Sequence, residues 1–116
     1  MDLRIVIVKE LNNYVKGIFV MEIGVKQKVI NEIIELAKEH GIEKVVLFGS
    51  RARGDYHRAS DIDLAVYGGD ITNFALDVEE KTSTLLFFDV VDMQKKHQDK
   101  FVKSIKEEGK ILYEKI

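Results

Sequence analysis

The 116-residue sequence contains no cysteine, no proline and no tryptophan. Without cysteine the chain can form neither a disulfide nor a thiolate metal site, and its three histidines are too scattered for a zinc motif. Long hydrophobic runs are absent near the start, where Lys9 and Glu10 interrupt the first apolar stretch. We therefore expect a cytoplasmic protein with no signal peptide and no transmembrane helix.

Neither sign of charge dominates the composition. Lysine and arginine together number 18 and aspartate and glutamate 20, so the net charge is -2. This balance gives no reason to expect a generally nucleic-acid-binding surface. Hydrophobic residues make up 46% of the chain and charged residues 33%, as in ordinary soluble domains. Since no repeat or low-complexity linker divides the sequence, we expect a single compact domain.

Apolar residues at helical spacing predict three helices. The clearest covers residues 26–40, where Val29, Ile30, Ile33 and Ala37 share one stripe and Gly41 supplies a left-handed stop. A second is predicted over residues 73–81, with Asp70 or Thr72 as its N-cap, and a third over residues 95–108, ended by Gly109.

Short β-branched and aromatic runs predict strands between these helices. They cover residues 44–48, 62–67, 85–91 and 111–113. We take the apolar residues 85–88 as core by default, although some of them could face a partner. Strands that interleave with helices predict an α/β or α+β fold.

Residues 1–20 permit two interpretations. Ile7, Leu11, Tyr14 and Ile18 have helical spacing, whereas residues 5–8 alone suit a short strand. Met21 would make a natural start of its own. We therefore treat residues 1–20 as an N-terminal extension of uncertain structure, added to a domain over residues 21–116.

The pair Gly49–Ser50 lies directly between a predicted strand and a predicted helical turn. Such a turn presents backbone N–H groups and a hydroxyl to a phosphate, and glycine permits close approach. Arg51 and Arg53 could add charge-assisted contacts to a triphosphate, or could be solvated helix residues. The pair is therefore a candidate nucleotide-binding turn.

Ten residues separate Ser50 from Asp61, and Asp61 and Asp63 begin the next predicted strand. Because strand side chains alternate, the two carboxylates point to one face and Ile62 to the other. Magnesium prefers hard oxygen ligands and commonly binds one or two carboxylates together with substrate phosphates. The pair therefore predicts a metal site beside the phosphate-binding turn.

A third carboxylate would ligate a second metal or act as general base, and residues 85–92 offer Asp89 and Asp92. Alternation places these two on opposite faces of one strand, so only one can join Asp61 and Asp63. We favour Asp89, since it stands within an apolar run where a lone carboxylate is costly unless it is used. Asp92 stands where the strand should end and suits a cap.

The site motif consists of two segments, Leu47-Phe48-Gly49-Ser50-Arg51-Ala52-Arg53-Gly54 and Ser60-Asp61-Ile62-Asp63-Leu64. This motif resembles the minimal nucleotidyltransferase family of the polymerase-β-like nucleotidyltransferase superfamily. The resemblance extends from about Met21 to Tyr113. It implies a mixed sheet flanked by helices, ATP or another NTP as substrate, and dependence on Mg²⁺, with two ions in some sites. It assigns the site to Gly49, Ser50, Asp61, Asp63 and Asp89.

Many members of that family are paired with a small helical HEPN protein. The pair resembles a toxin–antitoxin system in which the nucleotidyltransferase adds AMP to a toxin tyrosine and silences its ribonuclease activity. We therefore expect an AMP-transferring enzyme with a HEPN toxin as partner. A non-catalytic antitoxin that neutralises by contact, and a small-molecule enzyme of the aminoglycoside-modifying type, are the alternatives, and association with copies of itself stays open.

Overall fold

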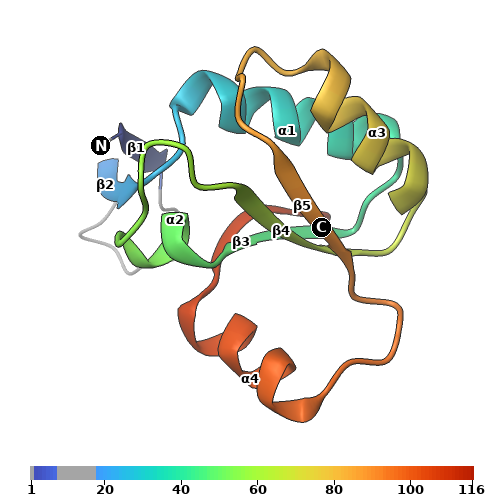
Figure 1. Cartoon of the computed structure of the whole chain (residues 1–116). Coiled ribbons are helices and arrows are strands. Elements are labelled where there is room, and N and C mark those ends of the chain that lie inside the picture. Colours follow the sequence, from blue (N-terminus) through green and yellow to red (C-terminus); the bar gives the residue numbers. More distant parts are fainter. Residues whose placement is uncertain (1, 8–17) are drawn as a thin grey trace.

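We analysed a computed structural model of the chain, which describes residues 2–7 and 18–116, with side chains from Ile23 onward. Figure 1 shows a sheet with helices on both sides. In chain order the elements are β1 (Asp2–Ile7), β2 (Ile18–Ile23), α1 (Gln27–Glu39), β3 (Lys44–Phe48), α2 (Ser50–Arg53), β4 (Ile62–Tyr67), α3 (Ile71–Lys81), β5 (Phe88–Asp92), α4 (Asp99–Glu108) and β6 (Lys110–Glu114).

Four strands form a mixed sheet in the order β5-β4-β3-β6. Strand β3 is antiparallel to both β4 and β6, whereas β4 and β5 are parallel. Helix α3 provides the crossover that a parallel pair requires. The expected fold class, a sheet flanked by helices, is confirmed, and the mixed strand directions agree with the resemblance.

The two faces of this sheet are covered unequally. Helices α1 and α3 lie over one face, and α4 lies on the other (Figure 1). The main core, on the α1 and α3 side, takes Ile62, Leu64 and Val66 from β4. A much smaller cluster on the α4 side joins Ala65 to Ile105. The α4 face of the sheet therefore carries little apolar packing.

Helix α1 follows the apolar stripe that predicted it. Val29, Ile30, Ile33 and Ala37 are all buried, and each large aliphatic side chain removed from water contributes about 1.5–3 kcal/mol. Gly41 has a φ of 65°, in the left-handed region where glycine costs least. The predicted helix and its stop are confirmed.

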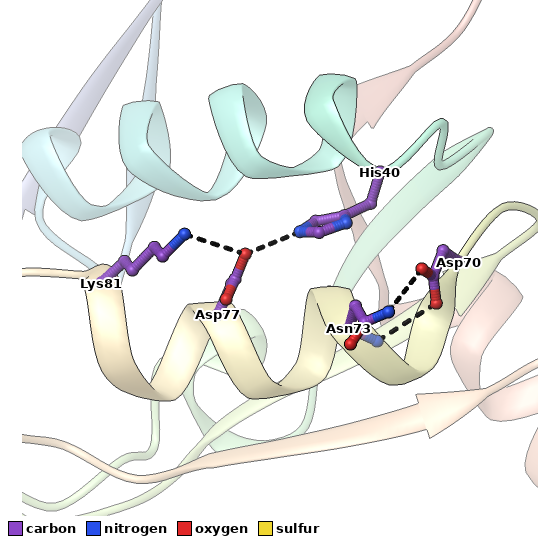
Figure 2. A network of polar contacts seen from close by, with 5 residues as sticks. All are labelled: His40, Asp70, Asn73, Asp77 and Lys81. Atoms are coloured by element: carbon purple, nitrogen blue, oxygen red, sulfur yellow. Dashed lines mark hydrogen bonds and ion pairs between the residues drawn. The ribbon is translucent and has the colours of Figure 1, made fainter.

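Polar contacts between α1 and α3 hold the two covering helices together (Figure 2). The Asp77 carboxylate lies 2.7 Å from Nε2 of His40 and 3.3 Å from Nζ of Lys81. At the start of α3 the Asp70 side chain accepts the backbone N–H of Asn73, so Asp70 is the cap. Helix α3 begins at Ile71, two residues before the predicted start.

Two other elements begin later than the sequence predicts. Strand β5 starts at Phe88, not at residue 85. Leu85 and Phe87 are exposed, by 100% and 72%, so assigning them to the core was wrong. Helix α4 starts at Asp99 instead of residue 95, because Asp92 first closes a turn by accepting the N–H of Gln94.

The N-terminal strands β1 and β2 form a separate antiparallel pair in which Asp2 faces Ile23 and Ile7 faces Ile18. The strand interpretation of residues 5–8 is confirmed as far as Ile7. The alternative helix depends largely on residues 8–17, which lie outside the described part of the chain. The boundary proposed between residues 20 and 21 falls within β2. Among the described residues, no helix combines the length and apolarity needed to span a membrane.

The Asp77 contacts make a prediction for stability at acid pH. The hydrogen bond from His40, followed by contacts with Lys81, lowers the pKa of Asp77. Its stabilisation is therefore present above the ordinary aspartate pKa of about 4 and is lost as pH falls through the lowered pKa. We expect Asp77→Asn to lower Tm modestly at neutral pH, and the difference from wild type to shrink below about pH 4.

The control is Glu107→Gln, which removes an exposed carboxylate 3.8 Å from Lys103. Exposed pairs of this kind contribute little, so Tm should not change at either pH. Thermal unfolding followed by circular dichroism measures both variants. An Asp77→Asn deficit that stays constant down to pH 2 would contradict the prediction.

Candidate active site

The register of β4 on β5 brings two predicted site residues together. Asp63 is paired with Asp89 across the parallel strands, whose backbones lie about 4.8 Å apart. Side chains at paired positions share a face, and two residues further along β4 Ala65 belongs to the α4-side cluster. Asp63 and Asp89 therefore lie side by side on the sparsely covered face.

Asp61 stands one residue before β4 and is exposed, whereas Asp63 is half-buried. Burial raises the pKa of Asp63, and the negative charges of Asp89 and Asp61 raise it further. The positive charge of Arg53 opposes this pKa shift. The charges of Asp61 and Asp89 thus both act on Asp63, whose anion is disfavoured by burial and by these two neighbours.

The turn at Gly49 is built against the same carboxylate. Gly49 has a φ of 72° and a ψ of -158°, a conformation open essentially to glycine alone. A Cβ at this position would overlap Oδ2 of Asp63. The Gly49 carbonyl accepts the N–H groups of Ala52 and Arg53, which starts helix α2 at Ser50. The predicted nucleotide-binding turn and the predicted metal-binding carboxylate are therefore in direct contact.

Arg51 does not project toward this face. Its side chain is buried, and the guanidinium donates to the carbonyls of Gly24, His57, Arg58 and Ser60 at 2.6–3.2 Å. It also lies 4.7 Å from the Tyr56 ring centroid. These donors fix the loop that delivers Asp61, so the expected phosphate contact of Arg51 gives way to a structural role.

The structural role of Arg51 is the feature that sequence reasoning missed. The only sequence signal of this packing is the glycine at position 24, where a side chain would overlap the Tyr56 ring. The glycine does not reveal what it packs against, because Gly24 and Tyr56 are 32 positions apart and no local pattern predicts such a pairing.

The structure keeps Arg53 near the carboxylates and separates Asp92 from them. Arg53 is exposed, close enough to Asp63 to influence its pKa, and paired with Asp55 and Glu108. It stays a candidate for phosphate contact. Asp92 is in register with Val66, three positions from Asp89 along β5, and its carboxylate caps the turn to Gln94. Of the two alternatives, Asp89 is the one beside Asp63.

The oxygen ligands present suit a divalent cation whose remaining ligands come from the substrate. In the described ranges, 2–7 and 18–116, no group of three or more His, Cys, Asp or Glu side chains forms a ready-made metal cage. Asp63 and Asp89 nevertheless offer adjacent hard oxygen ligands and repel each other in the absence of a cation. Mg²⁺ is typically held by one or two carboxylates plus phosphates, so this donor set fits it.

Comparison with known proteins identifies the family. A family model described as polymerase beta, nucleotidyltransferase, matches residues 31–116, which contain the turn and all three carboxylates. The chain belongs to the polymerase β nucleotidyltransferase family. The predicted enzyme class, a nucleotidyltransferase, is thereby confirmed.

Relatives of this nucleotidyltransferase agree with the resemblance to the minimal family. A Methanocaldococcus jannaschii protein, named as a candidate protein adenylyltransferase, is 34% identical over 100 residues, which are 76% of this chain and 98% of the relative. A toxin–antitoxin crystal structure with AMP-PNP matches with a TM-score of 0.62 at 26% identity, over 74% of this chain and 73% of that one. A mutant MntA–HpeT toxin–antitoxin structure matches with a TM-score of 0.59 at 26% identity, over 73% and 72%.

Contact between Gly49 and Asp63 makes a prediction for Gly49→Ala. The new Cβ imposes both backbone strain and overlap with the carboxylate, so we expect a loss of about 1–3 kcal/mol in the free energy of unfolding together with a severe loss of nucleotidyl transfer. The matched control is Gly54→Ala, since Gly54 also has a positive φ, of 99°, but its Cβ would meet nothing within 4 Å. That variant should lose stability and keep transfer. Equal activity losses would show that strain alone matters.

The raised pKa of Asp63 predicts a gain in stability when its charge is removed. An acid whose folded-state pKa is raised opposes folding at pH values above that pKa. In metal-free buffer at neutral pH, Asp63→Asn should therefore raise Tm, and the gain should vanish as pH falls below about 4. Transfer should fall by about 100-fold or more because a cation ligand is lost.

The matched control for this change is Asp92→Asn. It neutralises an aspartate of neighbouring β5 whose carboxylate caps the turn to Gln94. Tm should not rise and transfer should persist. Metal-free thermal melts at several pH values measure the effect, and an Asp63→Asn protein that melts below wild type at neutral pH would contradict the prediction.

Proposed function

We propose that this nucleotidyltransferase transfers AMP from ATP to a hydroxyl group of a partner protein, and that it acts as the antitoxin of a toxin–antitoxin pair. The observation that carries the proposal is the adjacency of Asp63 and Asp89 with Gly49 packed on Asp63. The turn at Gly49 and the carboxylate pair therefore lie close enough together to contact one triphosphate. This is the arrangement that metal-dependent nucleotidyl transfer requires.

Three features favour this function over other nucleotidyl transfers. The M. jannaschii relative is named for protein adenylylation, and the similar crystal structures are of toxin–antitoxin proteins, one with the ATP analogue AMP-PNP. The residues that match the minimal family support a HEPN toxin as partner and one of its tyrosines as acceptor. The exposed apolar side chains Leu85 and Phe87 also suit contact with a protein acceptor.

In the proposed reaction the backbone of Gly49 and the hydroxyl of Ser50 hold the triphosphate, and Arg53 offers positive charge nearby. Asp61, Asp63 and Asp89 would hold the divalent cation, for which we propose Mg²⁺. When bound, the cation neutralises phosphate charge and aligns the α-phosphate for attack.

The acceptor oxygen attacks the α-phosphorus and forms a new O–P bond. The bond between the α-phosphorus and the bridging oxygen breaks, and its electron pair leaves with pyrophosphate. Asp89, exposed at the start of β5, accepts the proton of the acceptor hydroxyl. Since positioning and charge neutralisation dominate such reactions, these few residues suffice. We place the reaction in the cytoplasm, where ATP is available.

The proposal predicts label transfer. Incubation of the purified protein with α-labelled ATP, Mg²⁺ and the product of the neighbouring gene should label that product. Asp61→Asn and Asp63→Asn should each reduce labelling by about 100-fold or more. Mass spectrometry of the labelled partner should find AMP on a tyrosine.

Lys38→Gln serves as control, because Lys38 is exposed in the last turn of α1 and contributes no predicted ligand. Neutralisation of the toxin that survives both aspartate changes, with no label on the partner, would contradict catalysis and favour an antitoxin that acts by contact. Label on an aminoglycoside in place of a protein would favour the small-molecule alternative.

A further inference from the structure

A basic cavity lies on the face of β4 opposite the carboxylates. Its volume is about 650 Å³, and it lies between the start of α1, the loop after α2 and the connection from α3 to β5. Ile62 contributes to its floor, and alternation along β4 directs Asp61 and Asp63 to the other face. We call this cavity the basic groove, defined by Lys26, Lys28, Tyr56, Arg58, Ile62 and Leu85.

The charge of the groove differs from that of the whole chain. Among the residues whose side chains are described, no aspartate or glutamate lines it, although the chain has a net charge of -2. The nearest carboxylate named in its hydrogen bonds is that of Glu32, which accepts the backbone N–H and the hydroxyl of Ser83. Lys26, Lys28 and Arg58 are exposed and form no ion pair with any described residue. The groove therefore presents unneutralised positive charge to a negatively charged ligand.

The rim of the groove also carries exposed apolar groups. Leu85, on the rim, is fully exposed, and Phe87, two residues further along, is 72% exposed. Exposed large apolar side chains that adjoin a cavity are typical of protein interaction sites. A free nucleotide has no need of such a rim, whereas a polypeptide with an apolar side chain would cover it.

The groove is continuous with the proposed active site along the chain. Residues 83–86 line it and lead through Phe87 into β5, where Asp89 stands beside Asp63. Ile62 lies between Asp61 and Asp63, and the carbonyl of Phe87 accepts its N–H. The groove and the carboxylates therefore adjoin the same end of β4, from its two faces.

We infer that the basic groove docks the acceptor polypeptide through a segment with acidic residues and an apolar anchor, and so directs the acceptor hydroxyl to the carboxylate edge. The inference rests on the proposed function, because it takes the acceptor to be a protein. It adds the chemistry of the recognised segment and the surface that recognises it. The nucleotide is left to the opposite face of β4, with the Gly49 turn and the carboxylates.

The test uses two soluble random copolymers as probes, one of glutamate and tyrosine and one of lysine and tyrosine. The full chain, with fluorescently labelled probes, is studied by anisotropy without ATP. We expect the acidic copolymer alone to bind, more weakly as salt rises because exposed charges are screened. The double change Lys28→Glu with Arg58→Glu should raise its Kd at least tenfold. Leu85→Ala should also raise Kd, to a smaller extent.

The substitutions are chosen so that folding is preserved. Lys28 lies in the first turn of α1, which contains no acidic residue, and a glutamate there suits the positive end of the helix dipole. Lys100→Glu is the matched control, because it makes the same charge change at an exposed position of α4 that does not line the groove. It should leave Kd unchanged.

Three results would overturn the inference. One is equal binding of the acidic and basic copolymers, and another is an unchanged Kd in the double variant. The third is a loss of AMP-PNP binding in the double variant, measured by calorimetry with Mg²⁺, while copolymer binding persists, since the groove would then be a nucleotide site. Because anisotropy needs no catalysis, Asp63→Asn should bind the acidic copolymer normally. Failure of label transfer alone would therefore contradict the proposed function and not the groove.

Discussion

The parallel register of β4 and β5 is the constraint on which the rest of the site depends. It places Asp63 beside Asp89 on a half-covered face of the sheet, where the charge of Asp89 adds to burial in raising the pKa of Asp63. Folding gains nothing from this pairing of like charges. The divalent cation that we propose would account for it, because a cation turns the same repulsion into a shared ligand set.

The opposite face of the same strand fixes that register. Ile62, Leu64 and Val66 are buried beneath α1 and α3, and a slip of one residue would expose all three and bury the carboxylates. The hydrophobic energy of one face thus holds the unfavourable charges on the other in place. Gly49 then fits the turn against Asp63, where any side chain would overlap the carboxylate. Core packing and site geometry are in this sense one arrangement.

Sequence reasoning succeeded where a local pattern determines structure. A short β-branched run predicted the bounds of β4, alternation predicted the division of its faces, and the apolar stripe with Gly41 predicted α1. The choice of Asp89 over Asp92 as the carboxylate beside Asp63 also came from local pattern, since an apolar neighbourhood and a strand end differ in sequence. The role of that pair in catalysis stays a prediction.

It failed where distant residues decide. Arg51 was expected to contact phosphate, but its burial depends on carbonyls of Gly24 and of the loop at 57–60, which no local spacing reveals. Leu85 and Phe87 were assigned to the core because they are apolar, yet they precede β5 and are exposed. An apolar run shows that burial is favourable, and it does not show whether the chain itself supplies the covering surface.

In the function that we propose, the chemistry and the recognition of the acceptor lie on different faces of β4. The face of β4 with the carboxylates has little apolar packing, and it carries the groups that we propose for nucleotidyl transfer. The other face is filled by the core except at its edge, where the basic groove and the exposed Leu85 begin. Unneutralised lysines and an exposed leucine at that edge are what a domain needs if its substrate is a folded partner and not a small molecule.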